Sequence, residues 1–381
     1  MIGYGKTKTI NQIQINNYAK MEPSTTTNPQ ENIFYKKLAN VNTKTEYLRE
    51  FINKLTPYRI CDHFIATEIR PTLRTYTHDN GLCETFNSYI NYQFAAPGNL
   101  ELRATDLLQT RNLWVIKTGD IIKVQVDYLK YFLDEVIPWL EMTHTRIILI
   151  TGQYTPPILK KGIISEILLK HPNILLWICE EPIYDERTNP KFMALPIGFC
   201  HMSIQPYMDF VKTQIQHNPR TLIPPIWDKP NLIVNTPSAV HRHLPDNHIR
   251  RTHPIFGSES GARIQYEEYL TRIKNAKFIM SPVGDRDDCH RHYESIGLGA
   301  IPISNIGDTY LPIFPEDSII RASPDEMVQI YTNQKLQPGI KYQSPNCDIL
   351  TTDYWINKIN MRLAMLGYPL KQNSVSTGKT K

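Results

Sequence analysis

Short apolar segments alternate with longer amphipathic ones through the first half of the chain. Five apolar segments have the length and composition of buried strands: 59–64, 113–117, 146–150, 174–178 and 192–195. Four other segments carry apolar residues at helical spacing: 46–55, 81–94, 124–140 and 158–170. Strands that alternate with helices pair in parallel, so this pattern predicts an α/β domain whose ligands bind at the carboxyl ends of its strands.

A proline-rich stretch around Trp227 separates this domain from a second unit with the same alternation. Five segments beyond it have the character of strands: 231–235, 255–256, 277–280, 300–303 and 318–321. Five more have the character of helices: 240–251, 265–274, 288–298, 324–334 and 354–366. Both halves of the chain therefore predict Rossmann-like sheets.

Composition and pattern divide the chain into five parts. Residues 1–43 are rich in Asn, Thr, Gln and Lys and predict a flexible tail. The first domain is expected at 44–222 and the second at 223–348. A last helical segment occupies 349–369, and a polar tail follows at 370–381.

The stretch 277–303 predicts a strand, a loop with Gly284, a helix and a second strand. The N-terminus of a helix after such a loop favours anions, because unpaired N–H groups and the helix dipole converge there. Arg291 and Glu294 share one face of the helix. We expect Arg291 to clamp a diphosphate and Glu294 to accept hydrogen bonds from ribose hydroxyls. Gly284 is expected to have a positive φ or to let the backbone approach a phosphate closely. The alternative is that it forms a plain turn.

Further candidate ligands flank this stretch. Ser281 and His290 could donate hydrogen bonds to phosphate, with an N-cap or a structural hydrogen bond as the alternative for each. Arg242 lies in the predicted helix 240–251 and could reach the same diphosphate. Asn235 and Ser238 lie in the loop before that helix and are weaker candidates for the same site.

Asp285-Arg286-Asp287 spells a DxD sequence, whose two carboxylates could hold Mn²⁺. Here Arg291 and the helix dipole can supply the positive charge. We therefore expect no Mn or Mg cofactor, and we expect the acidic loop to be solvated or to orient Arg242 or Arg286.

Composition excludes several classes of function. The net charge is +5 and the basic residues are scattered, which argues against a nucleic-acid partner. The six cysteines form no CxxC pair, so neither a structural zinc site nor a disulfide framework is expected. No run of 18 apolar residues predicts a transmembrane segment. A cytoplasmic protein is expected, with association at a membrane face left open.

Three motifs in the second half resemble the exostosin-like family of GT-B glycosyltransferases. They are Ser-Pro-Val-Gly at 281–284, Asp-Cys-His-Arg-His-Tyr-Glu at 288–294 and Gly-Ala-Ile-Pro-Ile at 299–303. The segment 190–198 and the Thr-Gly pair at 151–152 are also similar to the family, so the resemblance covers about residues 110–305. The chain departs from the pattern at Tyr293, where Trp is commoner, at 295–296, where the family has Ala-Leu, and in the acidic loop 285–287.

The resemblance implies two Rossmann-like domains that face each other across a cleft, with the last helix packed back on the first domain. It implies an inverting transfer from a nucleoside diphosphate sugar to a hydroxyl group of a glycan or glycoprotein. A UDP-sugar is the favoured donor and a GDP-sugar the main rival. The alternative is a non-catalytic module that binds a nucleotide sugar or a glycan.

An inverting transfer requires a general base, which should lie on a loop of the first domain. The candidates are carboxylates that follow the predicted strands: Asp79, Glu84, Glu181 with its neighbour Glu180, and Asp120. For each of them a helix cap or a turn carboxylate is the structural alternative.

Overall fold

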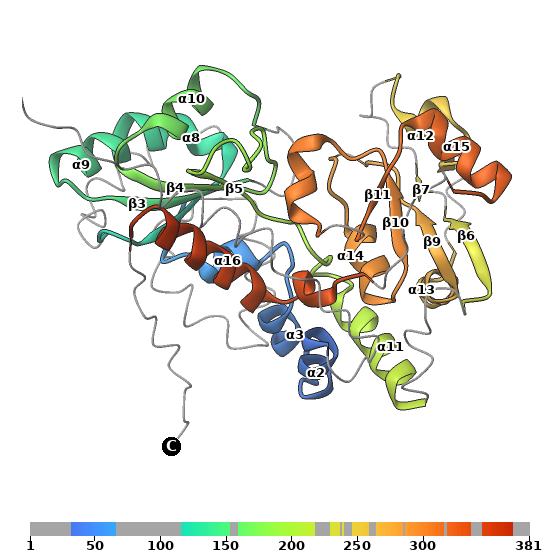
Figure 1. The fold of residues 1–381 in the computed structure, drawn as a ribbon. Coiled ribbons are helices and arrows are strands. Elements are labelled where there is room, and N and C mark those ends of the chain that lie inside the picture. The colour runs from blue at the N-terminus through green and yellow to red at the C-terminus, as the bar shows by residue number, and fades with distance from the viewer. Residues whose placement is uncertain are drawn as a thin grey trace, which may run out of the picture.

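The computed structural model describes residues 32–65, 116–152, 159–217, 229–236, 238–239, 246–258, 264–284, 286–315, 318–336 and 345–368. Within these ranges the chain forms two parallel β-sheets that lie side by side, each with helices packed on it (Figure 1). The predicted α/β class with two Rossmann-like units is confirmed at this level.

The first sheet has five parallel strands in the order β1-β2-β3-β4-β5. They are β1 His63–Ile65, β2 Ile121–Val124, β3 Ile147–Thr151, β4 Ile174–Cys179 and β5 Phe192–Ala194. Every residue of β3, β4 and β5 is buried, because elements cover both faces of the sheet. The apolar runs in the sequence are therefore the centre of this domain.

The second sheet has the order β11-β10-β9-β6, and its strands are also parallel. They are β6 Asn231–Asn235, β9 Ala276–Met280, β10 Ile301–Ser304 and β11 Ile320–Arg321. A separate short pair joins β7 Ser238–Ala239 to β8 Gly257–Ser258. All the strands predicted beyond the proline-rich stretch lie within two residues of these positions.

In the first domain α4 Thr56–Ile60 precedes β1. The helical segments that lie between its strands in sequence are η4 Val126–Tyr128, α8 Leu129–Tyr131, η5 Phe132–Val136, α9 Ile137–Met142 and α10 Ile163–Lys170. The predicted continuous helix 124–140 is wrong in detail, since 126–142 is a series of shorter helical segments. Pro138 lies in the first turn of α9 and cannot donate a backbone hydrogen bond, which fits the π-helical turn just before it.

Helices of the second domain are α12 Ile249–Thr252, α13 Tyr266–Lys274, α14 His290–Gly297, η7 Asp308–Ile313 and α15 Pro324–Asn333. The helix α11 Ile204–His217, which precedes the proline-rich stretch, was not predicted. After the second sheet come η8 Cys347–Leu350 and α16 Thr352–Met365. The side chains of Arg362 and Lys358 on α16 reach Glu186 of the first domain, and α16 contacts β4.

Three expectations for the first half need correction. The helix α2 Ile33–Ala39 lies inside the predicted tail, with Phe34 and Leu38 fully buried, so regular structure begins before α3 Lys44–Glu50. Part of the predicted strand 59–64 is helical in α4. In the predicted strand 113–117, the described residues 116–117 are not in a strand, and β2 begins at Ile121.

A continuous apolar core joins the two domains. It combines side chains of α2 and α3 with the inner faces of both sheets, for example Phe34, Ile150 and Ile279. Separate cores fill the outer face of each sheet, around Trp177 in the first domain and Phe278 in the second. The packing therefore fixes how the strand ends of one sheet face those of the other. In the described part of the chain, no helix is long and apolar enough to cross a membrane.

Candidate functional site

Charged side chains are buried where the carboxyl ends of the two sheets meet. Glu181 follows β4 and is 1% exposed, and Arg286 follows β9 and is 8% exposed. These two residues form an ion pair between the domains. We call the group that surrounds this pair the seam cluster: Lys54, Lys123, Glu180, Glu181 and Arg286.

Lys123 and Glu180 form the first-domain side of the seam cluster. Lys123 on β2 is fully buried, pairs with Glu180 and donates a hydrogen bond from Nζ to the Gly152 carbonyl at 2.9 Å. A Cβ at Gly152 would lie 2.3 Å from Oε2 of Glu180, so only glycine leaves room for this carboxylate. The Thr-Gly pair after β3 therefore has a steric role beside the charges.

Lys54 reaches the seam cluster because the loop before α4 packs on the loop after β5. Gly198 has φ +64° there, and a Cβ on it would lie 2.3 Å from the Ile52 carbonyl oxygen. The Phe199 N–H donates to that oxygen at 2.9 Å. Burial and the nearby charge of Arg286 lower the pKa of Lys54 to about 8.

Glu181 has the titration behaviour that a general base needs near neutral pH. Burial raises the pKa of Glu181 to about 7; the charge of Arg286 opposes this shift and that of Glu180 adds to it. Apart from the ion pair with Arg286, no hydrogen bond to its carboxylate is formed by the residues that the structure describes. Of the predicted bases that the structure describes, Glu181 and Glu180 lie at the seam, and Glu180 is already paired with Lys123 of its own domain.

The glycine loop contacts α12 of the second domain. Gly284 does not have a positive φ, so that reason for a glycine is wrong. A Cβ at Gly284 would lie 3.1 Å from Nη2 of Arg250, and Nε2 of His248 lies 3.0 Å from the Gly284 carbonyl oxygen. The small residue thus lets a guanidinium approach the loop backbone.

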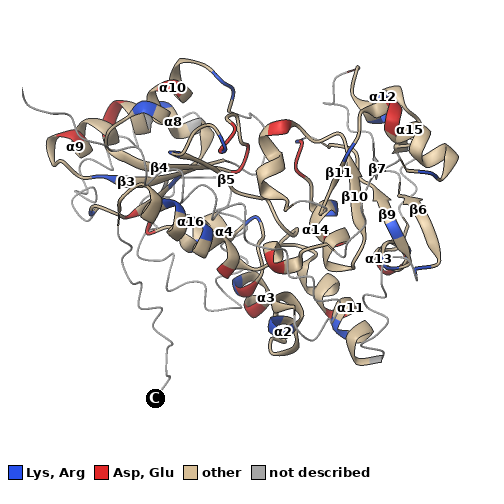
Figure 2. Cartoon of the chain, viewed as in Figure 1, with Lys and Arg blue, Asp and Glu red and all other residues tan. Residues whose placement is uncertain are grey.

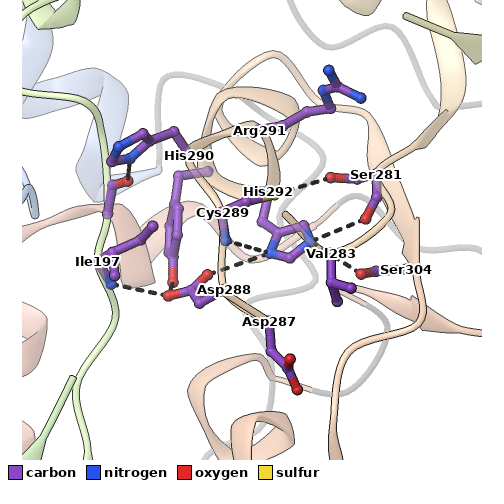
Figure 3. Close-up of polar contacts among 12 residues, drawn as sticks. Ile197, Ser281, Val283, Asp287, Asp288, Cys289, His290, Arg291, His292 and Ser304 are labelled. Carbon is purple, nitrogen blue, oxygen red and sulfur yellow. Dashed lines mark hydrogen bonds and ion pairs between the residues drawn. The ribbon is translucent and has the colours of Figure 1, made fainter. Parts of the chain in front are cut away.

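Asp288, just before α14, connects this helix to the first domain (Figure 3). Its Oδ2 accepts hydrogen bonds from the Ile197 N–H at 2.9 Å and from the Tyr293 hydroxyl at 2.6 Å. Its Oδ1 lies 3.3 Å from Nδ1 of His292. These contacts hold the N-terminus of α14 against the loop after β5.

Ser281 and Cys289 belong to the same buried network. The Ser281 hydroxyl lies 3.4 Å from Sγ of Cys289, and the Ser281 carbonyl oxygen lies 3.4 Å from Nε2 of His292 (Figure 3). Burial lowers the pKa of His292, but the Cys289 sulfur and the Asp288 carboxylate outweigh it and raise that pKa overall. Ser281 therefore forms the internal hydrogen bond that was predicted as the alternative to phosphate binding.

His290 contacts the first domain through its ring. Nδ1 lies 2.7 Å from the Gly198 carbonyl oxygen, which can only accept, so Nδ1 carries the proton. Burial lowers the pKa of His290 to about 4, so the ring is neutral at pH 7 and Nε2 is an acceptor. In this state Nε2 cannot donate a hydrogen bond to phosphate.

Arg291 and Glu294 both contact Tyr269 of α13. The guanidinium of Arg291 lies over the Tyr269 ring at 5.9 Å and donates to the Met280 carbonyl at 3.2 Å. Glu294 is 6% exposed, and its two oxygens accept hydrogen bonds from Tyr266 and Tyr269 at 2.8 and 2.7 Å. Burial raises the pKa of Glu294. Their roles in nucleotide binding stay predictions.

The remaining predicted residues are dispersed. The side chain of Asn235 donates to the Ile255 carbonyl. Ser238 lies in β7, where only its backbone pairing is described. Asp120 precedes β2 and contacts His63 at 3.1 Å, so it lies at the edge opposite the carboxyl ends of the strands and is wrong as a base. Asp79, Glu84, Arg242 and Asp285 lie outside the described residues.

Asp287 of the acidic loop makes a contact that the sequence did not predict. Oδ2 of Asp287 accepts a hydrogen bond from the Gly307 N–H at 3.0 Å, so this carboxylate fixes the loop after β10. Within the described ranges, no three His, Cys, Asp or Glu side chains are grouped as metal ligands.

Four basic residues near the seam were not among the predicted ligands: Lys54, Lys123, Arg250 and Arg286. Lys123 was recognisable as a charge inside an apolar strand, which needs a buried partner. The other three are brought to the seam by contacts between distant segments, for which the sequence carries no local signal.

Comparison with known proteins adds little to this geometry. No family model and no curated protein matches the chain. Among solved structures, the chain is similar to the N-terminal domain of trehalose-6-phosphate phosphatase from Candida albicans, at 13% identity and a TM-score of 0.34. The alignment covers 79% of this chain and 82% of that one. A likeness at this level carries no argument about activity.

Proposed function

We propose that the protein is an inverting glycosyltransferase of the GT-B type, which moves a sugar from a nucleoside diphosphate sugar to a hydroxyl group. The observation that carries this proposal is the buried Glu181–Arg286 pair, which joins a candidate base of the first domain to a cation on the glycine loop of the second. A base and a phosphate-binding cation on opposite sides of one seam are what an in-line displacement needs.

In this proposal Glu181 takes the proton of the acceptor hydroxyl. The acceptor oxygen forms a bond to the anomeric carbon, and the bond from that carbon to the diphosphate oxygen breaks on the opposite face. The electron pair leaves with the diphosphate, whose charge is met by Arg286, by Arg250 and by the N-terminus of α14.

Arg286 then has two partners in turn. In the structure it pairs with Glu181 and opposes the rise of the pKa of that carboxyl group. A diphosphate competes for the same guanidinium, because phosphate oxygens accept its bidentate hydrogen bonds. Donor binding therefore releases the Glu181 carboxylate from its ion pair and makes it a stronger base.

The donor is proposed to be a UDP-sugar, with a GDP-sugar as the rival, and the acceptor a glycan or glycoprotein. These choices rest on the motifs at 281–303, because the sequence there resembles the donor half of exostosin-like enzymes. Arg291 remains a proposed diphosphate ligand and Glu294 a proposed ribose acceptor. The arginines and the helix dipole supply positive charge, so the proposal includes no metal.

The test is sugar transfer by the purified protein from UDP- and GDP-sugars to a panel of glycan acceptors, with the anomeric configuration read by NMR. We expect an inverted product, lost in Glu181→Gln and retained in the control Glu166→Gln, which changes an exposed carboxylate on α10. Full activity of Glu181→Gln would show that Glu181 is not the base and would leave Asp79 and Glu84 as the candidates. Nucleotide-sugar binding without any transfer would favour the non-catalytic module.

A further inference from the structure

The short helix α10 exposes an unusual amount of apolar surface. Ile163 is 81% exposed, Ile164 41% and Ile167 44%, while Ser165 and Leu168 of the same helix are fully buried. At 100° per residue the three isoleucines occupy one continuous arc of about 100°. We call this arc the isoleucine face.

The isoleucine face is distinct from the scattered apolar residues that any protein surface carries. Elsewhere in the described ranges, an exposed large apolar side chain lies alone, such as Ile33 on α2, or in a smaller group, such as Met361 and Met365 on α16, which are 39% and 40% exposed. Three β-branched apolar side chains grouped on one exposed arc mark an interaction surface.

Two lysines lie at the N-terminal end of the isoleucine face. Lys160 and Lys161 immediately precede α10 and are exposed, and Figure 2 shows basic positions on the loop that enters this helix. Glu166 is the acidic residue of α10, and Lys170 pairs with it at 3.2 Å. The surroundings of the isoleucine face therefore carry a net positive charge from the two lysines.

We propose that the isoleucine face docks on an anionic lipid surface. An apolar arc flanked by lysines matches a bilayer boundary, where isoleucine side chains enter the acyl region and ammonium groups stay among anionic headgroups. The exposed surface area of three isoleucine side chains is far smaller than the roughly 800 Å² per partner that a stable dimer buries. A second copy of the chain is thus a poorer occupant.

The position of α10 gives this docking a defined orientation. The helix begins at the carboxyl edge of the first sheet, because it connects the end of β3 to the start of β4. Its Ser165 hydroxyl lies 3.0 Å from the Tyr184 hydroxyl, and Tyr184 is three residues beyond Glu181. The first turn of α10, which carries Ile163 and Ile164, therefore starts at the same edge of the first domain as the seam cluster.

The test is sedimentation of the full-length protein with vesicles of phosphatidylcholine alone or with 30 mol% phosphatidylserine (about the anionic content at which such surfaces attract basic segments). We expect binding to the anionic vesicles that weakens as salt is raised. Ile163→Ser with Ile167→Ser should lower the partition coefficient at least about tenfold. Lys160→Gln with Lys161→Gln should lower it about fivefold per lysine and remove the salt dependence.

The matched control is Ile33→Ser, which removes an exposed isoleucine from α2 and should bind as the wild type does. Circular dichroism and thermal midpoints of every variant check that each one folds. Absence of wild-type binding to anionic vesicles would overturn the proposal, as would binding that survives the double isoleucine change. A concentration-dependent dimer that this change abolishes would assign the face to a second copy instead.

Discussion

Glu181 forms an ion pair with Arg286 of the second domain, while Lys54, Lys123 and Glu180 of its own domain act on its carboxyl group through their charges. Burial raises the pKa of this carboxyl group to about 7, whereas an ordinary glutamate titrates at about 4.3. A base with this pKa is ionised in a useful fraction at neutral pH and still binds a proton well. The same raised value makes its titration visible in a pH profile.

For the proposed transfer, kcat/KM should rise with pH and level off above about pH 7. The base acts only in its ionised form, so activity is lost as the pH falls through the folded pKa, about tenfold per pH unit below it. Rates measured between pH 5 and 9 check this. Glu181→Gln should lower the plateau by about 10²- to 10⁴-fold. A profile that is flat down to pH 5 would indicate a base with an ordinary carboxyl pKa.

Lys123 and Glu180 depend on each other because both are almost inaccessible to water. Lys123→Met leaves an unpaired buried carboxylate and should reduce the free energy of unfolding by about 3–5 kcal/mol. Adding Glu180→Gln removes that charge and should restore at least about half of the loss. Urea denaturation of both variants measures this coupling. If the two effects simply add, the pair is not coupled as described.

Glu294 accepts hydrogen bonds from two tyrosines and is also the residue predicted to bind the ribose of a nucleotide. Its oxygens have lone pairs beyond the two hydrogen bonds, so we expect Glu294→Gln to lower nucleotide affinity about tenfold. Tyr266→Phe, which removes one internal hydrogen bond, is the matched control and should change affinity far less. Calorimetric titration with UDP compares the two. Equal effects would mean that Glu294 only supports α13.

At the scale of elements, two loops place Lys54 beside the acidic residues. The loop before α4 and the loop after β5 touch backbone to backbone at Gly198. The φ of +64° at Gly198 lies in the left-handed region, which disfavours any side chain. This contact therefore depends on one glycine.

Gly198→Ala should destabilise the protein by about 2–4 kcal/mol, since it adds left-handed strain and a clash with the Ile52 carbonyl. The control is Gly162→Ala, where a Cβ meets nothing within 4 Å, and its cost should stay within about 1 kcal/mol. Thermal or urea unfolding measures both. Similar costs at the two sites would show that the loops do not pack as described.

Elements with a strong local pattern were predictable. The strand 231–235 coincides with β6, because an apolar run between polar residues has few alternatives. The helix α2 was missed, since the polar composition around it concealed the helical spacing of Phe34 and Leu38. The helix around Pro138 was predicted as continuous because the prediction used only the amphipathic pattern and ignored the effect of the proline.

The candidate site was predictable only in part. Glu181 was a candidate because it follows an apolar strand, and the strand ends of parallel sheets bind ligands. Its pairing with Arg286 joins positions more than a hundred residues apart, which no local pattern specifies. Ser281, His290 and Glu294 were expected to face a ligand, yet each of them forms a hydrogen bond inside the protein.

At the scale of the whole molecule, a continuous core below the seam holds the two sheets together. Asp288 and His290 add polar contacts from α14 to the loop after β5. The domains therefore meet through both apolar packing and hydrogen bonds. A ligand that binds at the seam contacts both domains, so its binding should raise the free energy of unfolding of the entire protein.

The most direct test of a nucleotide-sugar site at the seam is the thermal midpoint of unfolding with UDP-, GDP- and CMP-sugars. A ligand at 100 times its Kd adds about 2.7 kcal/mol of stability. We predict a rise of several degrees with a UDP-sugar, or with a GDP-sugar as the rival, and a much smaller rise in Arg286→Met. A wild-type midpoint that none of these compounds changes would contradict the account.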